Sequence, residues 1–169
     1  MPPRSDPTAR PVPVEEVDAA IGLIRGERWA ALSTVEPDGA PLGAMAAYAV
    51  ARDWSAVYLH LSTLSRHTRN LFHDTRAALT IAMSDDGRSD PQTLARLTLM
   101  GQVKSLERDS QHYQRVRALY LRRLPESEQL FEFTDFVLFE MTPAAVHYVG
   151  GFVRAYHFDY QKVVDQIRR

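Results

Sequence analysis

The side chains best suited to chemistry in this sequence occur together where an apolar run ends and a helical pattern begins. The cluster consists of Ser62, Thr63, Ser65, Arg66, His67 and Thr68. The first residues of a helix carry unpaired N–H groups and a partial positive charge, which attract anions. Arg66 adds a fork of donors that suits phosphate oxygens, and His67 adds another donor. Two interpretations are open: a phosphate site, or a solvated helix start capped by Ser65.

A run of small residues precedes this cluster. The sequence GAMAAYA at residues 43–49 lacks the bulky β-branched side chains that core strands normally carry. Small side chains allow another surface to approach the backbone closely, so the run either packs against a helix or receives a flat ring. A flat ring on a phosphorylated chain describes FMN. The sequence contains no Gly-rich dinucleotide fingerprint and no P-loop, which disfavours NAD and ATP bound in the usual folds.

The elements that must position these residues are mostly strands in hairpin order. Strand patterns occupy residues 28–35, 41–51, 56–62, 76–84, 94–108 and 135–151. Helical patterns occupy residues 13–26, 65–73 and 109–124, a short helical piece is expected at 125–133, and the tail 158–169 is also expected to be helical. The order does not alternate strand and helix, which disfavours a doubly wound parallel sheet. An antiparallel barrel with peripheral helices fits best.

Local signals refine these elements. Pro37, Asp38 and Gly39 predict a tight turn between the first two strands. Gly101 predicts a bulge within the fifth strand, and Thr142-Pro143 predicts a break in the sixth. Asp109 is a candidate cap for the helix that follows it.

Composition indicates one globular domain at residues 13–169 after a disordered lead-in at residues 1–12. The net charge of −1 predicts no nucleic-acid or membrane partner, so the arginines of the helix at 109–124 are interpreted as a solvated face. The chain has no cysteine, which excludes disulfides, zinc–thiolate sites and a cysteine nucleophile. No run is long enough to span a bilayer and the start lacks a signal peptide, so we expect a cytoplasmic protein.

Taken together, the runs ALSTVEPDGAPLGAMAAYAV, VYLHLSTLSRHTRNLFHDTRAALTI and ARLTLMGQVKSL resemble the pyridoxamine 5'-phosphate oxidase-like superfamily of FMN-binding split barrels. They are most similar to its haem-utilisation (HugZ-type) branch, in which S-x-L-x-x-H-T-x-N-L and a late G-G-F-G-R-A are familiar. The resemblance covers residues 28–155. It implies a six-stranded antiparallel Greek-key split β-barrel and a homodimer with FMN at the subunit interface. The implied function is that of an FMN-dependent oxidoreductase of unknown substrate.

The resemblance also implies a set of cofactor-binding positions. These are Ala44, Met45, Ala46, Leu61, Ser62, Ser65, Arg66, His67, Thr68, Arg96 and Thr98. In the oxidases a Ser-Arg-Lys run grips the FMN phosphate, and His67 takes the place of its lysine. Ala44 replaces a phosphate-binding arginine and Arg96 replaces a flavin-contacting glutamine. The late Trp and Arg that bind the oxidases' substrate are not evident, so vitamin B6 chemistry is not expected.

The same resemblance leaves a haem-binding or haem-degrading function as an alternative, and a non-catalytic flavin-binding module as a third. VGGFVRA at residues 149–155 is either a strand-end bend or a site where Arg154 borders the cofactor or a haem propionate. A histidine near it, His147 or His157, is the candidate axial haem ligand. Longer relatives carry a further C-terminal domain, which we expect this chain to lack. We expect no dedicated metal site, and we expect His60 to face solvent or a subunit contact.

Overall fold

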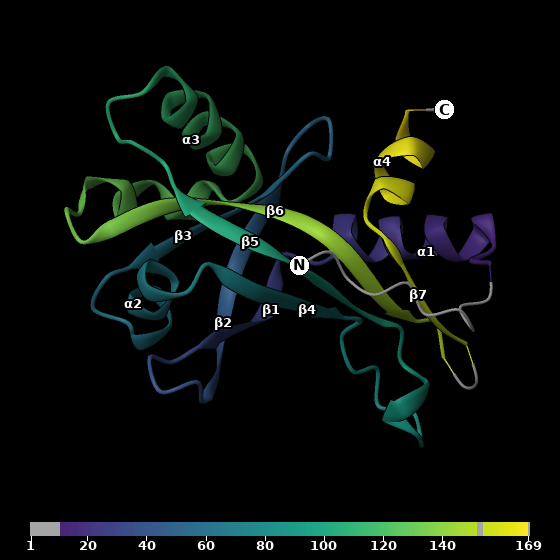
Figure 1. The fold of residues 1–169 in the computed structure, drawn as a ribbon. Helices are drawn as coiled ribbons and strands as arrows, with labels where there is room; N and C mark the ends of the chain where they lie inside the picture. The colour runs from purple at the N-terminus through teal and green to yellow at the C-terminus, as the bar shows by residue number, and fades with distance from the viewer. Residues whose placement is uncertain (1–10, 152–153, 169) are drawn as a thin grey trace.

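Six antiparallel strands close into a barrel, with helices around its periphery (Figure 1). The architecture comes from a computed structural model that describes residues 11–151 and 154–168. The strands are β1 (Trp29–Val35), β2 (Pro41–Val50), β3 (Val57–Ser62), β4 (Arg76–Ala82), β5 (Arg96–Ser105), β6 (Phe136–Val149) and β7 (Ala155–Asp159). The helices are α1 (Val14–Gly26), α2 (Arg66–His73), α3 (Gln111–Arg123) and α4 (Gln161–Ile167), with 3₁₀ segments η1 (Pro91–Thr93) and η2 (Pro125–Glu132). None of the helices within this described part of the chain has the length and hydropathy needed to cross a membrane.

The strand order confirms the predicted barrel and adds one strand to it. Neighbours follow the order β3-β2-β1-β4-β5-β6-β7, and β3 also pairs with β6, which closes the ring of six. The chain crosses over from β3 to β4 through α2, so β4 pairs with β1 and not with β3. β7 extends the sheet beyond β6; the sequence predicted no strand there, and the expected helical tail at residues 158–169 overlaps only its end. Of the predicted lead-in, residues 1–10 lie outside the described residues, and Val12 packs against the core.

The pairing is irregular at Gly101 as predicted, but the extra residue, Ala144, lies on the sixth strand and not on the fifth, and the predicted break in the sixth strand is wrong. The register of β5 against β6 shifts between Met100 and Gly101, opposite Pro143. A Cβ at position 101 would lie 2.9 Å from the Cα of Pro143, so a side chain there would collide with backbone. β6 runs through Thr142 and Pro143 without interruption because the bulge accommodates a proline that cannot donate to the ladder.

Two hydrophobic clusters hold the helices to the barrel. The larger cluster fills the barrel and continues under α1, whose Val17, Ala20, Ile21 and Ile24 are buried. The smaller cluster lies between α3 and the outer side of β3, where Tyr113, Val116 and Tyr120 pack near Tyr58. In Figure 1, α2 and α3 lie toward one side of the barrel and α1 and α4 toward the other. The cap of α3 is Ser110, whose Oγ accepts from the N–H of Tyr113 at 3.0 Å, and not Asp109 as the sequence predicted.

The barrel is split between β2 and β3. These strands pair only from Tyr48 to Val50, opposite Leu59 to Val57. Beyond that point α2 packs against both β1 and β2. Its Asn70 donates a buried hydrogen bond of 3.1 Å to the hydroxyl of Thr34 on β1. The split therefore brings the predicted phosphate cluster next to the small-residue strand.

Candidate functional site

The hydroxyl-rich turn at the end of β3 is tied to its own surroundings. The Ser62 hydroxyl donates to Asp135 Oδ2 at 2.6 Å and accepts from the N–H of Leu64 at 3.2 Å. Ser65 occupies the N-cap position of α2, but its side chain makes no capping hydrogen bond, so that prediction is wrong. The turn is held instead by Arg69, which donates to the backbone carbonyls of residues 63 and 64.

Arg66 and His67 offer less positive charge than their sequence suggests. Arg66 Nη2 lies 2.6 Å from Glu36 Oε2, which projects from the turn between β1 and β2. The guanidinium is exposed, so the pair is weak and an incoming anion would compete with Glu36 for it. Burial lowers the pKa of His67 below its ordinary value of 6.5, so the imidazole is mostly neutral at pH 7. Of these two residues, only Arg66 would therefore offer a phosphate a full positive charge, and Glu36 already shares it.

Three of the predicted contacts are core positions. Ala46 and Leu61 belong to the buried cluster inside the barrel. Thr68 is fully buried, and its hydroxyl has no hydrogen-bond partner among the described residues. The side chain of Met45, by contrast, is 48% exposed, while Ala44 is half-buried. On β2, Met45 is therefore the predicted residue whose side chain is most open to a ligand.

Arg96 and Thr98 lie elsewhere on the sheet. Cross-strand pairing forms one row across the outer face of the barrel: Met45, Ala31, Thr80, Thr98, His147 and His157. Thr98 is three strands from Met45, roughly 14 Å along the sheet. Its hydroxyl hydrogen-bonds that of Thr80 at 2.9 Å, and the Arg96 guanidinium donates to the carbonyls of Gln92 and Leu94. One chain therefore does not bring the predicted cofactor contacts of β2 and β5 together.

The outer row ends in two histidines. His147 on β6 and His157 on β7 are direct cross-strand partners, with ring centroids 6.4 Å apart, and both are exposed. The sequence marked each as a single residue near the Gly-Gly motif. Their adjacency depends on β7, which the sequence did not predict.

His60 is the clearest miss in the site analysis. It was expected to face solvent or a subunit contact, but it is buried and stacks on Phe131 with ring centroids 3.8 Å apart. Burial, reinforced by the charges of Arg108 and Arg117, lowers the pKa of His60 to about 4. β3 is buried on both faces, by the barrel on one side and by α3 with η2 on the other, so alternation could not show which way His60 faces.

The Gly-Gly motif is fixed to α1. Arg154 Nη1 lies 3.3 Å from Oε1 of the buried Glu16, and the guanidinium also donates to the carbonyl of Gly150. A Cβ at position 150 would lie 2.8 Å from Glu16 Oε2, so a side chain there would force the Glu16 carboxylate to shift. These contacts support the interpretation of the motif as a strand-end bend. Residues 152 and 153 lie outside the described residues.

Dedicated metal chemistry finds no support in the part of the chain that the structure describes. Residues 11–151 and 154–168 contain no group of three or more His, Cys, Asp or Glu side chains placed to hold a metal ion. His112, one of the single histidines, instead lies with its Nε2 2.5 Å from Glu140 Oε2. Burial alone would raise the pKa of Glu140, but hydrogen bonds from Lys104 and His112 outweigh it and lower that pKa.

Known proteins resemble this chain over most of its length. A family model described as "CREG, beta-barrel" matches residues 11–161. The chloroplastic haem oxygenase HOZ of Arabidopsis thaliana is 31% identical over 150 residues, which are 88% of this chain and 43% of that protein. The haem oxygenase HutZ of Vibrio cholerae is 30% identical over 137 residues, which are 79% of this chain and 76% of that protein. The chain thus spans less than half of the plant relative.

Solved structures agree with the fold. A haem-binding protein from Mycobacterium smegmatis superposes with a TM-score of 0.78 at 25% identity, over 94% of this chain and 62% of that one. A Clostridium acetobutylicum protein of the pyridoxinephosphate oxidase family superposes with a TM-score of 0.69 at 15% identity, over 90% of this chain and 99% of that one. The second likeness is one of fold alone, and it confirms the split-barrel architecture that the motifs predicted.

Proposed function

Because the chain belongs to the CREG β-barrel family, we propose that it binds haem and degrades it on a split-barrel scaffold. Two relatives at about the same identity carry the name haem oxygenase. The observation within this chain that supports the proposal is the exposed cross-strand pair of His147 and His157. Imidazole is a common axial ligand of haem iron. The oxidative chemistry itself would be supplied by the iron and by oxygen with a reductant.

The chain's composition and the state of its other histidines narrow the choice of ligand. The sequence has no cysteine, so an axial thiolate is excluded. His60 is buried and His112 is engaged with Glu140. Of the other four, His67 and His73 lie on α2, whereas His147 and His157 form a cross-strand pair beside an outer face of small side chains on which a flat macrocycle can lie. Arg96 shares this face and offers a guanidinium that suits a propionate.

FMN binding with oxidoreductase activity is the second candidate. Its support is the split beside β2, where exposed Met45 and the small residues around it leave the strand open to a ring. Against it, Arg66 is shared with Glu36 and the pKa of His67 is lowered. A non-catalytic flavin module would use the same contacts without turnover.

A homodimer would complete either site. Trp29 of β1 and Met45 of β2 are exposed, and the same two strands, with β4 and β5, line a cavity of about 390 Å³ whose walls are largely apolar. A second copy packed on the outer face of these strands would bring its own Thr98 toward Met45, two positions that one chain keeps apart. Light scattering on Met45→Lys should report a monomer, whereas Leu64→Lys, at another exposed apolar residue, should remain dimeric. A dimer that survives Met45→Lys, or a monomeric wild type, would overturn this assignment.

Haem titration followed by the Soret band tests the function. The wild-type protein should bind haem saturably, and His147→Ala or His157→Ala should shift the band or weaken binding at least tenfold. His73→Ala, which removes an exposed histidine of α2, should change nothing. An unchanged band in both variants would remove the histidine pair from the proposal.

A parallel titration with FMN separates the second candidate. Arg66→Ala should then weaken FMN binding, while Arg88→Ala, another exposed arginine paired with one carboxylate, should not. FMN binding with no haem binding would replace the haem proposal. A cytoplasmic location, suggested by the absence of cysteine, stays a prediction that cell fractionation can check.

A further inference from the structure

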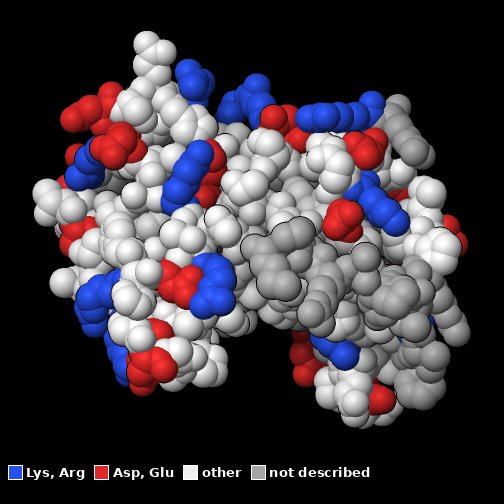
Figure 2. Space-filling view, in the orientation of Figure 1, with Lys and Arg blue, Asp and Glu red and all other residues white. Residues whose placement is uncertain are grey.

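A second concave site lies away from all the positions considered so far. It is a cavity of about 520 Å³ between α1, α3 and the turn that joins β2 to β3. Its described lining includes four arginines and no acidic residue: Arg25, Arg52, Arg122 and Arg123. We call it the arginine pocket. Across the face of the molecule shown in Figure 2, by contrast, basic and acidic groups are interspersed.

Two of these arginines, Arg25 and Arg123, are fixed by contacts within the protein. Arg123 donates to the backbone carbonyls of Arg25 at 2.7 Å and Glu27 at 2.8 Å, so it satisfies the end of α1. The Arg25 guanidinium lies over the ring of Trp54, 5.2 Å from its centroid. Both guanidinium groups are therefore held in place at the pocket, and neither is paired with a carboxylate in the described part of the chain.

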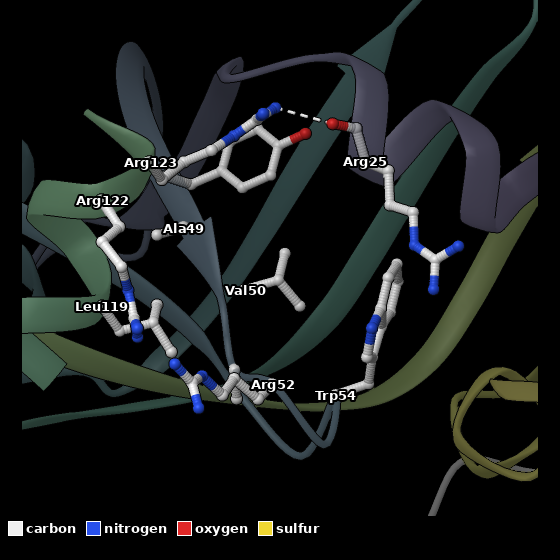
Figure 3. Close-up of a pocket in the computed structure, with 10 residues that line it drawn as sticks. Arg25, Ala49, Val50, Arg52, Trp54, Leu119, Arg122 and Arg123 are labelled. Atoms are coloured by element: carbon white, nitrogen blue, oxygen red, sulfur yellow. Dashed lines mark hydrogen bonds between the residues drawn. The ribbon is translucent and has the colours of Figure 1, made fainter. Parts of the chain in front are cut away.

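The other two arginines are not fixed in this way. Arg52 and Arg122 are exposed, and the ion pairs found among the described residues involve other arginines. Figure 3 shows them pointing toward the same side of the pocket, from the β2–β3 turn and from α3, opposite Arg25 and Trp54. The neighbouring acid, Asp53, is engaged within its own turn by Ser55. Like charges thus converge with no counter-charge between them, which a bound anion would relieve.

The turn that carries Arg52 is strained. Trp54 has a φ of +60°, a conformation that is a genuine outlier for a bulky residue. It is held there by burial, by its N–H bond to the Ala51 carbonyl at 3.0 Å, and by Arg25. Strain of this kind concentrates at ligand sites, where surrounding contacts impose one geometry. Here the geometry places Arg52 at the rim of a pocket with an apolar floor that includes Val50 and Leu119.

From this arrangement we propose that the arginine pocket binds a small molecule with two or more anionic groups, gripped by Arg52 and Arg122. The cavity volume falls within the range of small-molecule sites. Guanidinium forks bind phosphate and carboxylate oxygens with similar geometry, so the shared chemistry is that of a polyanion. The apolar floor would add contacts to a ligand that also carries a ring.

Calorimetric titration with pyrophosphate, ATP and citrate tests this assignment. The protein should bind at least one of them saturably at moderate salt. Arg52→Gln/Arg122→Gln should weaken that binding about tenfold or more, since each charge-assisted hydrogen bond that is lost is worth about that factor. Arg28→Gln/Arg115→Gln removes the same charge from exposed arginines outside the lining and should leave the affinity within about twofold.

The outcomes separate cleanly. Tightest binding of pyrophosphate or ATP assigns the pocket to phosphates, and tightest binding of citrate assigns it to carboxylates. Because the sequence has two tryptophans, Trp29→Phe leaves Trp54 as a single fluorescent reporter inside the pocket, and its emission should respond to the ligand. Equal weakening by both double variants, or no saturable binding of any probe, would overturn the proposal.

Discussion

The α2 junction, residues 62–70, and the α3 side of the molecule treat polar groups in opposite ways. At the junction, Ser62 is bonded to Asp135, Arg66 to Glu36 and Asn70 to Thr34. On the α3 side, His60 is buried without a hydrogen-bond partner among the described residues, and Arg52 and Arg122 converge without an acid. A cluster that looks reactive in sequence is largely satisfied by its own neighbours. Apart from the buried Thr68 hydroxyl at the junction, the unsatisfied groups of the two regions come from segments far apart in the chain.

Low pH should destabilise the folded protein chiefly through the buried imidazole of His60. The pKa of His60 is about 4 in the folded protein against 6.5 when unfolded, so between these values the unfolded state binds the extra proton. The free energy of unfolding should therefore fall as the pH drops through this window, by about 3 kcal/mol in total from this group. Denaturant titrations at several pH values check this.

Two histidine variants complete that test. His60→Leu keeps a similar volume and should lose the extra acid sensitivity, because nothing at this position then titrates. His73→Leu removes an exposed histidine and should keep the wild-type dependence. If the two variants respond to pH alike, the burial assigned to His60 is wrong.

Removing a buried hydrogen bond of the α2 junction should have the next largest effect on the free energy of unfolding. Asn70→Ala removes the buried bond to Thr34 and leaves that hydroxyl unpaired, which should cost about 2 kcal/mol of unfolding free energy. A double-mutant cycle with Thr34→Val isolates the pair, because the doubly substituted protein leaves no orphaned partner. Strictly additive losses would show that the bond contributes nothing.

Arg123 tests whether a pocket arginine can be structural. Arg123→Ala should lower the unfolding free energy by about 1 kcal/mol, because the last carbonyls of α1 lose their donor. Arg122→Ala, one residue away and without such bonds, should leave stability within about 0.5 kcal/mol. Thermal unfolding of both variants measures the difference, and equal values would contradict the division of roles within the pocket.

The smallest effect on stability is expected at the exposed pair. Glu36→Gln should change the unfolding free energy by less than about 1 kcal/mol, since the ion pair with Arg66 is exposed. It should nevertheless raise the affinity of the α2 junction for FMN or phosphate, because Arg66 is released. Asp86→Asn, which breaks the similar pair with Arg88, is the matched control and should leave that affinity unchanged.

Local pattern was enough for most of the fold. Hairpin order, the Pro37–Gly39 turn and the irregular pairing at Gly101 follow from turn chemistry and from two-residue periodicity, which act over a few neighbours. β7 was not predicted because it is only five residues long and follows a Gly-Gly bend. The continuity of β6 through Thr142 and Pro143 was not predicted, because it depends on the pairing of Pro143 with Gly101 of β5 and on the extra residue Ala144 beside the proline.

The candidate sites divide in the same way. The sequence by itself determined that hydroxyls, Arg66 and His67 would meet at a strand-to-helix junction, since they are adjacent in the chain. Only the tertiary structure decided that Glu36 would pair with Arg66 and that β3 would be covered on both faces. It also decided that Arg25, Arg52 and Arg122 would share one cavity. Contacts of that kind depend on barrel closure and register, which no short stretch of sequence contains.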